Sequence, residues 1–221
     1  MHTFTTPAPV TTVLDVPGAH ISLTAADRAD TTVEVLPADP ARSRDVKAAG
    51  RTAVDHADGV LSIRTAPAEN RILGDTGSVR VVVHLPAGSV LRAKAADARL
   101  HSTGRLGEVT LDAARATVEL DHTAEARLTL MAGDVSLARL EGSARISTSQ
   151  GDIAVTEAMR GTVELSTESG SISIGAAPGV SASLDAGTPY GRIHNALRND
   201  GAPDLHIRAT TAYGDITARS L

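Results

Sequence analysis

A three-residue glycine motif recurs through the C-terminal part of the chain and constrains the fold more than any other feature. Its five copies are Gly133-Asp134-Val135, Gly151-Asp152-Ile153, Gly170-Ser171-Ile172, Gly191-Arg192-Ile193 and Gly214-Asp215-Ile216. Two weaker copies begin with alanine, Ala96-Asp97-Ala98 and Ala114-Arg115-Ala116. The seven copies start at residues 96, 114, 133, 151, 170, 191 and 214, and are therefore 18, 19, 18, 19, 21 and 23 residues apart. Such self-similarity indicates a repeat protein, in which one small unit is stacked many times.

Between the glycines, apolar and polar residues alternate in the pattern of half-buried strands. Each repeat is therefore predicted to hold two short strands, separated by turns in which glycine can adopt positive φ without a Cβ clash. The positions predicted to point inward are Val135, Ile153, Ile172 and Ile216 on the first strand of their repeats, and Ile146, Leu165 and Leu184 on the second.

Two all-β architectures fit this pattern. In a parallel β-solenoid, similar to a β-helix, each repeat of 18 to 23 residues is one coil and equivalent strands stack in parallel, about 4.8 Å apart. In an antiparallel β-meander each repeat is a hairpin. We favour the solenoid because the same residue types recur at equivalent positions. Hairpin turns also favour Asn-Gly or Asp-Gly, whereas the order here is Gly-Asp.

Residues 1–95 are also strand-like but lack the repeat. Solenoids need atypical terminal units to cover the open end of the stack. We therefore predict that residues 1–95 form an irregular N-terminal β cap, continuous with a solenoid over residues 96–221. Two connections rich in Pro, Asp, Ala and Arg, Pro37–Arg51 and Ala66–Gly77, are predicted to be surface loops.

Composition narrows the class of function. The net charge of −5 is spread along the chain, which argues against nucleic-acid binding. The absence of cysteine excludes disulfides, thiolate metal sites and cysteine nucleophiles. The first seven residues lack the basic and apolar regions of a secretory signal, and the most apolar stretch, Val79–Leu85, is too short to cross a bilayer. We expect a cytoplasmic protein without direct membrane insertion.

No phosphate-binding loop, nucleophile elbow or paired-carboxylate motif is recognisable, so no catalytic residue, cofactor or metal is predicted. The feature most similar to a metal site is the set of motif aspartates that stacking would align. Calcium needs six to eight oxygens, yet each turn supplies one carboxylate at most, and Arg115 and Arg192 share the same position. We expect these aspartates to bond turn amides instead.

Tyr190 and Tyr213 each directly precede a motif glycine, so stacking predicts that the two rings are neighbours near the C-terminal end. Arg192, His194 and Arg198 lie nearby in sequence, and the last two belong to the expanded segment that makes the final repeat step the longest. These five residues are the candidate interaction site, for a protein partner or a small anion. The alternative is that the rings close the end of the stack.

Three segments resemble a bacterial family of β-strand-repeat proteins, a domain of unknown function labelled "putative adhesin". They are Thr148-Ser149-Gln150-Gly151-Asp152-Ile153, Thr167-Glu168-Ser169-Gly170-Ser171-Ile172 and Thr211-Ala212-Tyr213-Gly214-Asp215-Ile216. The stretch Val79–Gly88 is similar to the lead-in to that family's repeats. The resemblance implies a β-solenoid-like fold and no established enzyme activity, and it offers no catalytic residues.

The function predicted from these features is non-enzymatic: a β-solenoid scaffold or protein-interaction module that binds a protein partner or itself. A ligand-binding or regulatory module that uses the Tyr190 and Tyr213 end is the alternative. The chain stops at Leu221 while still in the repeat's pattern. We therefore expect the last repeat to be the uncovered end of the stack and a surface for self-association or for a partner.

Overall fold

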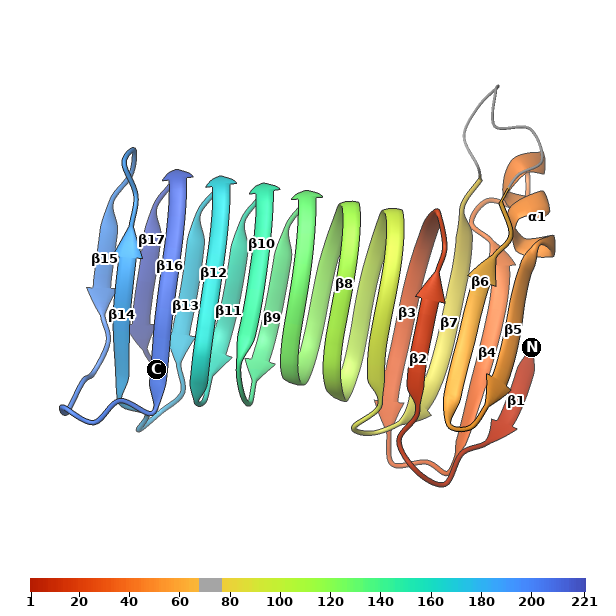
Figure 1. Ribbon diagram of the computed structural model, residues 1–221, viewed down its shortest axis with the longest axis horizontal. Helices are drawn as coiled ribbons and strands as arrows, with labels where there is room; N and C mark the ends of the chain where they lie inside the picture. Colours follow the sequence, from red (N-terminus) through yellow and green to blue (C-terminus); the bar gives the residue numbers. More distant parts are fainter. Residues whose placement is uncertain (68–76) are drawn as a thin grey trace. The chain divides into compact units, whose positions relative to one another are not determined.

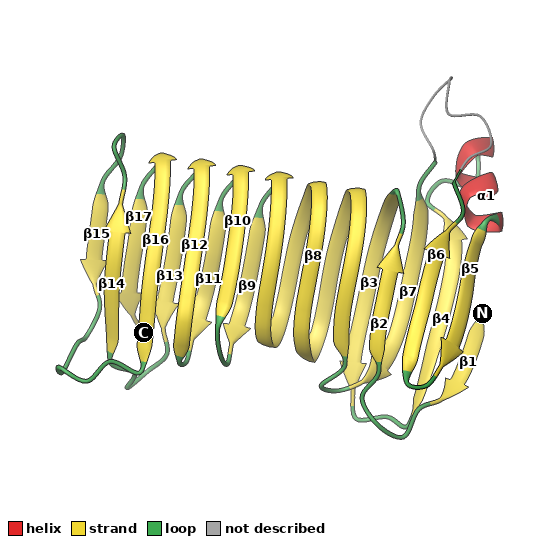
Figure 2. Cartoon of the chain, viewed as in Figure 1, coloured by secondary structure: helices red, strands yellow, loops and turns green. Residues whose placement is uncertain are grey.

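The computed structural model describes residues 1–67 and 77–221. They form two compact units, unit 1 (Met1–Ala116) and unit 2 (Thr117–Leu221), and each unit is described by itself. The described residues contain seventeen strands and one short helix (Figures 1 and 2). The predicted all-β class is confirmed. No helix of the described residues is long and apolar enough to cross a bilayer.

Unit 2 is built from short strands that alternate between two sheets. Its strands are the part of β8 (Val90–Ala132) after residue 116, β9 (Val135–Leu140), β10 (Ala144–Gln150), β11 (Ile153–Ala158), β12 (Gly161–Ser169), β13 (Ile172–Ala176), β14 (Ala182–Gly187), β15 (Ile193–Ala196), β16 (Leu205–Tyr213) and β17 (Ile216–Ser220).

Every strand pairing in unit 2 is parallel. One sheet has the order β8, β9, β11, β13, β17, β15, and the other has the order β8, β10, β12, β16, β14. The register matches equivalent repeat positions, as in the pairing of Ile153 with Val135 on one side and with Ile172 on the other. This arrangement is the predicted parallel β-solenoid, and it excludes the antiparallel meander for unit 2.

The order of the coils differs from the order of the sequence at one end of unit 2. The last coil of the chain, β16 and β17, lies between the coil of β12 and β13 and the coil of β14 and β15 (Figure 1). The terminal coil of unit 2 is therefore β14–β15, and the expectation that the last repeat forms the end of the stack is wrong. The connection over residues 197–204 is long enough for the chain to pass from β15 back to the position between the coils of β12–β13 and β14–β15. This connection accounts for the longest repeat step.

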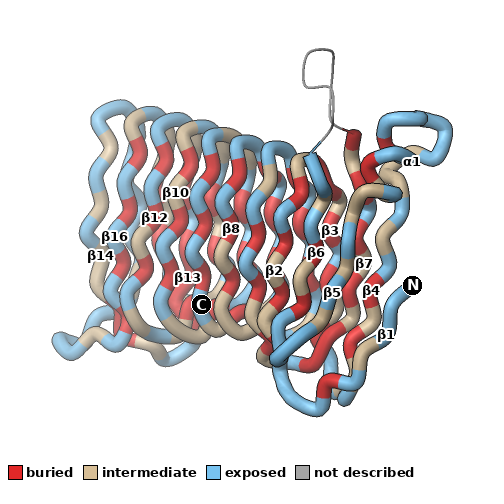
Figure 3. The backbone as a smooth tube through the Cα atoms, turned by 45° about the vertical axis from the view of Figure 1, so that its right-hand side comes forward, coloured by how far each residue is buried: buried red, intermediate tan, exposed pale blue. Residues whose placement is uncertain are grey.

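Buried residues alternate with exposed ones along the strands of unit 2 (Figure 3). Most of the buried residues are aliphatic, and the buried polar ones are threonines and one serine. Six of the seven predicted inward residues are at most 1% exposed: Val135, Ile146, Ile153, Leu165, Ile172 and Ile216. The seventh, Leu184, is only half-buried because it lies on terminal strand β14. Full burial of such a side chain contributes roughly 1.5 to 3 kcal/mol.

Glycine at the first motif position permits close approach of adjacent coils. A Cβ on Gly170 would lie 2.0 Å from the carbonyl oxygen of Gly151, and the φ of Gly170 is 153°. The same carbonyl oxygen accepts a hydrogen bond from the hydroxyl of Thr167, at 3.1 Å. Thr211 bonds Gly170, and Thr188 bonds Gly214, in the same way. The sequence pattern Thr-x-x-Gly therefore ties each turn to the preceding coil of the stack.

The motif aspartates accept hydrogen bonds from turn amides, as expected. The carboxylate of Asp134 accepts from the amide of Asp152 at 2.9 Å, and that of Asp152 accepts from the amide of Ser171 at 2.7 Å. The structure thus gives the aspartate column a role in holding coils together. Within the described ranges, no group of three or more His, Asp or Glu side chains is placed to hold a metal ion.

Unit 1 contains the non-repeating strands. Its elements are β1 (His2–Thr5), β2 (Thr11–Asp15), β3 (Gly18–Ala26), β4 (Asp30–Pro37), α1 (Ser43–Gly50), β5 (Thr52–Ala57), β6 (Val60–Thr65), β7 (Val79–Pro86) and the first part of β8. The pairs β1–β4, β4–β7 and β5–β6 are antiparallel, whereas β2 and β3 pair in parallel with β6, β7 and β8. Unit 1 includes residues up to 116, so it does not coincide with the predicted cap of residues 1–95, which stays a prediction.

The segment Pro37–Arg51 is not simply a surface loop, because it contains α1. The carboxylate of Asp45 is buried and accepts hydrogen bonds from the amides of Asp39, at 3.2 Å, and Ser78, at 2.9 Å. Ala48 is also buried, and the helix lies against β4 and β7. Of the other predicted loop, residues 68–76 lie outside the described residues.

Candidate functional site

The terminal coil of unit 2 presents two strand edges. Within the described residues, β14 pairs only with β16 and β15 pairs only with β17. The other edge of each strand therefore carries backbone N–H and C=O groups without a strand partner. Proteins usually pair, cover or charge such edges, because an open edge is a template for another chain.

The connection after β15 covers only the beginning of β14. The amide of Ala182 donates to the carbonyl of Arg198 at 2.9 Å, and the amide of Asp200 donates to the hydroxyl of Ser181 at 3.1 Å. These contacts anchor the connection next to the first residue of β14. Among the described residues, no hydrogen bond continues this contact along residues 183–187 on the outer edge.

Tyr190 and Tyr213 are brought together by the stack, as their sequence positions predict. Their ring centroids are 4.9 Å apart and the ring planes are only 5° from parallel. The side chains are exposed, at 66% for Tyr190 and 60% for Tyr213. The two large rings therefore form an accessible aromatic surface beside the motif turns of the last two coils.

Arg192 follows Tyr190 by two residues and is held by Asp215. Its guanidinium contacts the carboxylate of Asp215 at 3.1 Å, and its amide donates to the same carboxylate at 2.9 Å. The backbone hydrogen bond and then the guanidinium lower the pKa of Asp215 below its usual value. His194 is exposed on β15 opposite Thr217, and Arg198 lies beyond β15, where its amide bonds the Ser220 hydroxyl.

Ile193 also belongs to this site, but its motif did not identify it as an exposed residue. It occupies the motif position of Ile172 and Ile216, which are 1% and 0% exposed, but it is itself 47% exposed. Glycine and isoleucine occupy the first and third motif positions in all three copies, so the order of the coils explains the difference. The lengthened final repeat step is the single sequence signal that could have indicated it.

A hydroxyl–imidazole pair lies on the outer face of the same coils. The Ser183 hydroxyl and Nδ1 of His206 are 3.0 Å apart, in a shallow cavity of about 290 Å³. A catalytic triad also needs a carboxylate that orients the imidazole. The contacts of the described residues include none between His206 and a carboxylate, and Asp185 in this cavity pairs with Arg208 at 3.3 Å. The arrangement therefore lacks the geometry of a serine hydrolase.

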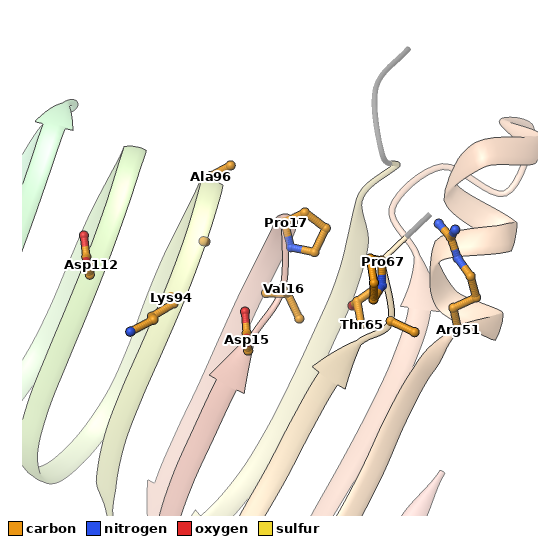
Figure 4. Close-up of a pocket in the computed structure, with 11 residues that line it drawn as sticks. Asp15, Val16, Pro17, Arg51, Thr65, Pro67, Lys94, Ala96 and Asp112 are labelled. Atoms are coloured by element: carbon orange, nitrogen blue, oxygen red, sulfur yellow. The ribbon is translucent and has the colours of Figure 1, made fainter. Parts of the chain in front are cut away.

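Unit 1 has a larger open cavity of about 570 Å³ (Figure 4). Its lining includes the side chains of Arg51, Lys94, Asp15 and Asp112. The two cations and two carboxylates balance, so the cavity does not favour ligands of either charge. We assign it no function.

A comparison with solved structures gives distant matches to bacterial proteins. Over 98% of this chain, a protein of Bacteroides fragilis described as "a putative adhesin" has 11% identity and a TM-score of 0.49, with 95% of that chain covered. A protein of Parabacteroides distasonis with the description "putative adhesin" has 13% identity and the same TM-score and coverage. A Clostridium sporogenes protein described as "a putative cell adhesion protein" has 7% identity and a TM-score of 0.39, covering 100% of this chain and 98% of that one. A comparison with curated proteins gives no match.

The family comparison is more specific than these distant structural similarities. The model of the Toastrack family DUF4097, a domain of unknown function, matches residues 74–219. The match includes all seven motif copies and every strand of unit 2 except the last residue of β17. The chain therefore belongs to the Toastrack DUF4097 family.

Proposed function

We propose that this protein is a non-enzymatic interaction module that binds a partner polypeptide through the terminal coil of unit 2, β14–β15. The observation that carries the proposal is the exposure of Ile193 between two strand edges that have no partner among the described residues. A second polypeptide could cover the exposed apolar side chain and pair with the open strand edge at the same time.

Ile193 differs from the equivalent isoleucines of the stack in the number of coils that cover it. Ile172 and Ile216 are fully buried by the coils on both sides, whereas Ile193 has a coil on one side only. A partner that buries the exposed half of this side chain would contribute on the order of 1 kcal/mol. Strand pairing along β14 and β15 and contact with the tyrosine rings would add to this.

The descriptions of structural relatives agree with a role in protein interaction, although their similarity extends to the fold alone. The lack of a carboxylate partner for His206 among the described residues favours the non-enzymatic role. The cytoplasmic location stays a prediction.

Photo-crosslinking in the host cell tests the proposal. A benzoylphenylalanine is placed at Ile193 in one variant and at Val46 on α1 in a control, since these aliphatic residues are 47% and 48% exposed. We expect an adduct of one defined mass from position 193 and none from position 46. Equal adducts from both positions, or none from either, would contradict the proposal.

A second candidate function is the binding of a small anionic aromatic ligand by Tyr190, Tyr213 and Arg192. The exposed, parallel rings favour it, because planar ligands stack on such surfaces, and Arg192 follows Tyr190 by two residues. The chain has two tyrosines and no tryptophan, so its tyrosine fluorescence reports on this site alone. Titration with a series of aromatic carboxylates should then change the emission in a saturable way. Unchanged emission at millimolar concentrations of every compound would exclude the function for that class.

A further inference from the structure

We propose that the partner covering the terminal coil is a second copy of this chain, related by a two-fold axis that sets β14 of each copy against β15 of the other. This inference rests on the proposed function and names its partner. It follows from the direction of the two open strands, from the apolar residues between them and from their charges.

The terminal coil has two open strand edges within the described residues. β14 and β15 run in opposite directions within one coil (Figure 1), and each has one edge without a strand partner among the described residues. A single extended peptide can pair with only one of them. Leu184 on β14 and Ile193 on β15 would then stay partly exposed, whereas a second terminal coil supplies two strands and covers both side chains.

The opposite directions of β14 and β15 also suit a two-fold axis. A two-fold axis parallel to the strands places β14 opposite the partner's β15 and makes both new strand pairs antiparallel. It also brings the two turns that contain Tyr190 to the same side of the interface. The stacked pair of Tyr190 and Tyr213 in each copy would then be continued by the pair of the other copy.

The charges on β14 and beside β15 favour the same arrangement. β14 carries Asp185, while Arg192 lies at the start of β15. Each already pairs within its own chain, Asp185 with Arg208 at 3.3 Å and Arg192 with Asp215 at 3.1 Å. When β14 of one copy lies against β15 of the other, Asp185 of each copy faces the end of the strand that follows Arg192 of the other copy. Positive and negative side chains then alternate across the interface. The other two-fold arrangement, β14 against β14, would set Asp185 against its own copy and is disfavoured.

Sedimentation equilibrium of the full chain between 1 and 100 μM tests the dimer. We expect a dimer for the wild type and for Val46→Lys, and a monomer for Ile193→Lys, because lysine at an edge opposes strand pairing. Tyr190→Glu is a second variant at an exposed position and should also be monomeric. A wild type that stays monomeric at 100 μM, or a dimer that survives both edge substitutions, overturns the inference.

Charge reversal tests the arrangement. Asp185→Arg and Arg192→Glu should each weaken the dimer about tenfold or more, since each reversal acts twice across the two-fold axis. An equimolar mixture of the two variants should recover the affinity as a heterodimer, because every facing pair is again of opposite sign. Failure of the mixture to recover contradicts the pairing of β14 with β15.

The failure of this inference can be separated from failure of the proposed function. A monomeric wild type together with a position-193 adduct to a different protein would contradict the second copy but support the interaction module. A monomeric wild type with no adduct would contradict both.

Discussion

Ile193 and Ile216 are register partners in adjacent coils and occupy the same position of the repeat, yet Ile216 is 0% exposed and Ile193 is 47% exposed. The difference arises because β17 lies between two strands and β15 pairs with only one in the described structure. The exposed fractions of these two equivalent residues thus distinguish the end of the stack from its interior.

The same substitution at these two positions should have very different effects on stability. Ile216→Lys buries an unpaired charge and should lower the free energy of unfolding by more than about 3 kcal/mol. Ile193→Lys should change it by less than about 1 kcal/mol, because the ammonium can reach water. Urea unfolding followed by circular dichroism measures both, at a concentration low enough to keep the protein monomeric. Equal losses would show that the order of coils is wrong.

The close approach at the motif glycines predicts a strong effect of Gly170→Ala. The new Cβ would meet the Gly151 carbonyl oxygen at 2.0 Å, and the positive φ of 153° is unfavourable for alanine. We expect a loss of about 2 to 4 kcal/mol in the free energy of unfolding. Gly187→Ala is the matched control, since nothing lies within 4 Å of its Cβ position and its φ is not positive. Similar losses in the two variants would contradict the role of the glycine ladder.

The hydroxyl of Thr167 should contribute measurably to the stack. Thr167→Val keeps the shape of the side chain but removes the donor to the Gly151 carbonyl, at a cost of about 1 kcal/mol. Thr129→Val, at an exposed position of β8, provides the comparison and should be nearly neutral. Thermal unfolding measures the melting temperatures of the two variants. Equal melting temperatures would show that the hydrogen bond from the Thr167 hydroxyl does not contribute to stability.

Acid should weaken the terminal coil through Asp215. The Arg192 amide and guanidinium lower the pKa of this carboxyl in the folded state, so its stabilising effect is present above the unfolded pKa of about 4 and is lost as the pH falls through the lower folded value. Stability should therefore decrease more steeply below pH 4 in the wild type than in Asp215→Asn. The free energy of unfolding is measured against pH for both proteins. Parallel curves would contradict a stabilising contact between Asp215 and Arg192.

Metal ions should leave the stability unchanged. The carboxylates of Asp134 and Asp152 already accept backbone amides, and each turn offers one carboxylate at most to a cation. Melting temperatures in calcium and in chelator should agree within experimental error. A calcium-dependent increase of several degrees would overturn the structural role of the aspartate column.

The repeat made much of unit 2 predictable from sequence, because in-register stacking requires the same residue type at each position. Val135, Ile153 and Ile172 are buried as predicted, and the tyrosines meet because each precedes a motif glycine. Helix α1 was not predictable from the Pro, Asp and Arg composition of its segment, since its stability depends on burial of the Asp45 carboxylate against distant Ser78. The order of the last two coils was also not predictable, because the motifs of Ile193 and Ile216 are locally alike and only long-range pairing distinguishes them.

Amide hydrogen exchange of the full chain at 1 and 100 μM tests most directly whether β14–β15 is the end of the stack and the surface that a second copy covers. At 1 μM, residues 182–196 should exchange faster than residues 205–220, whose strands have neighbours on both sides. At 100 μM, protection should increase in residues 182–196 and stay unchanged in residues 205–220. Faster exchange in residues 205–220, or exchange in residues 182–196 that does not depend on concentration, would contradict the account.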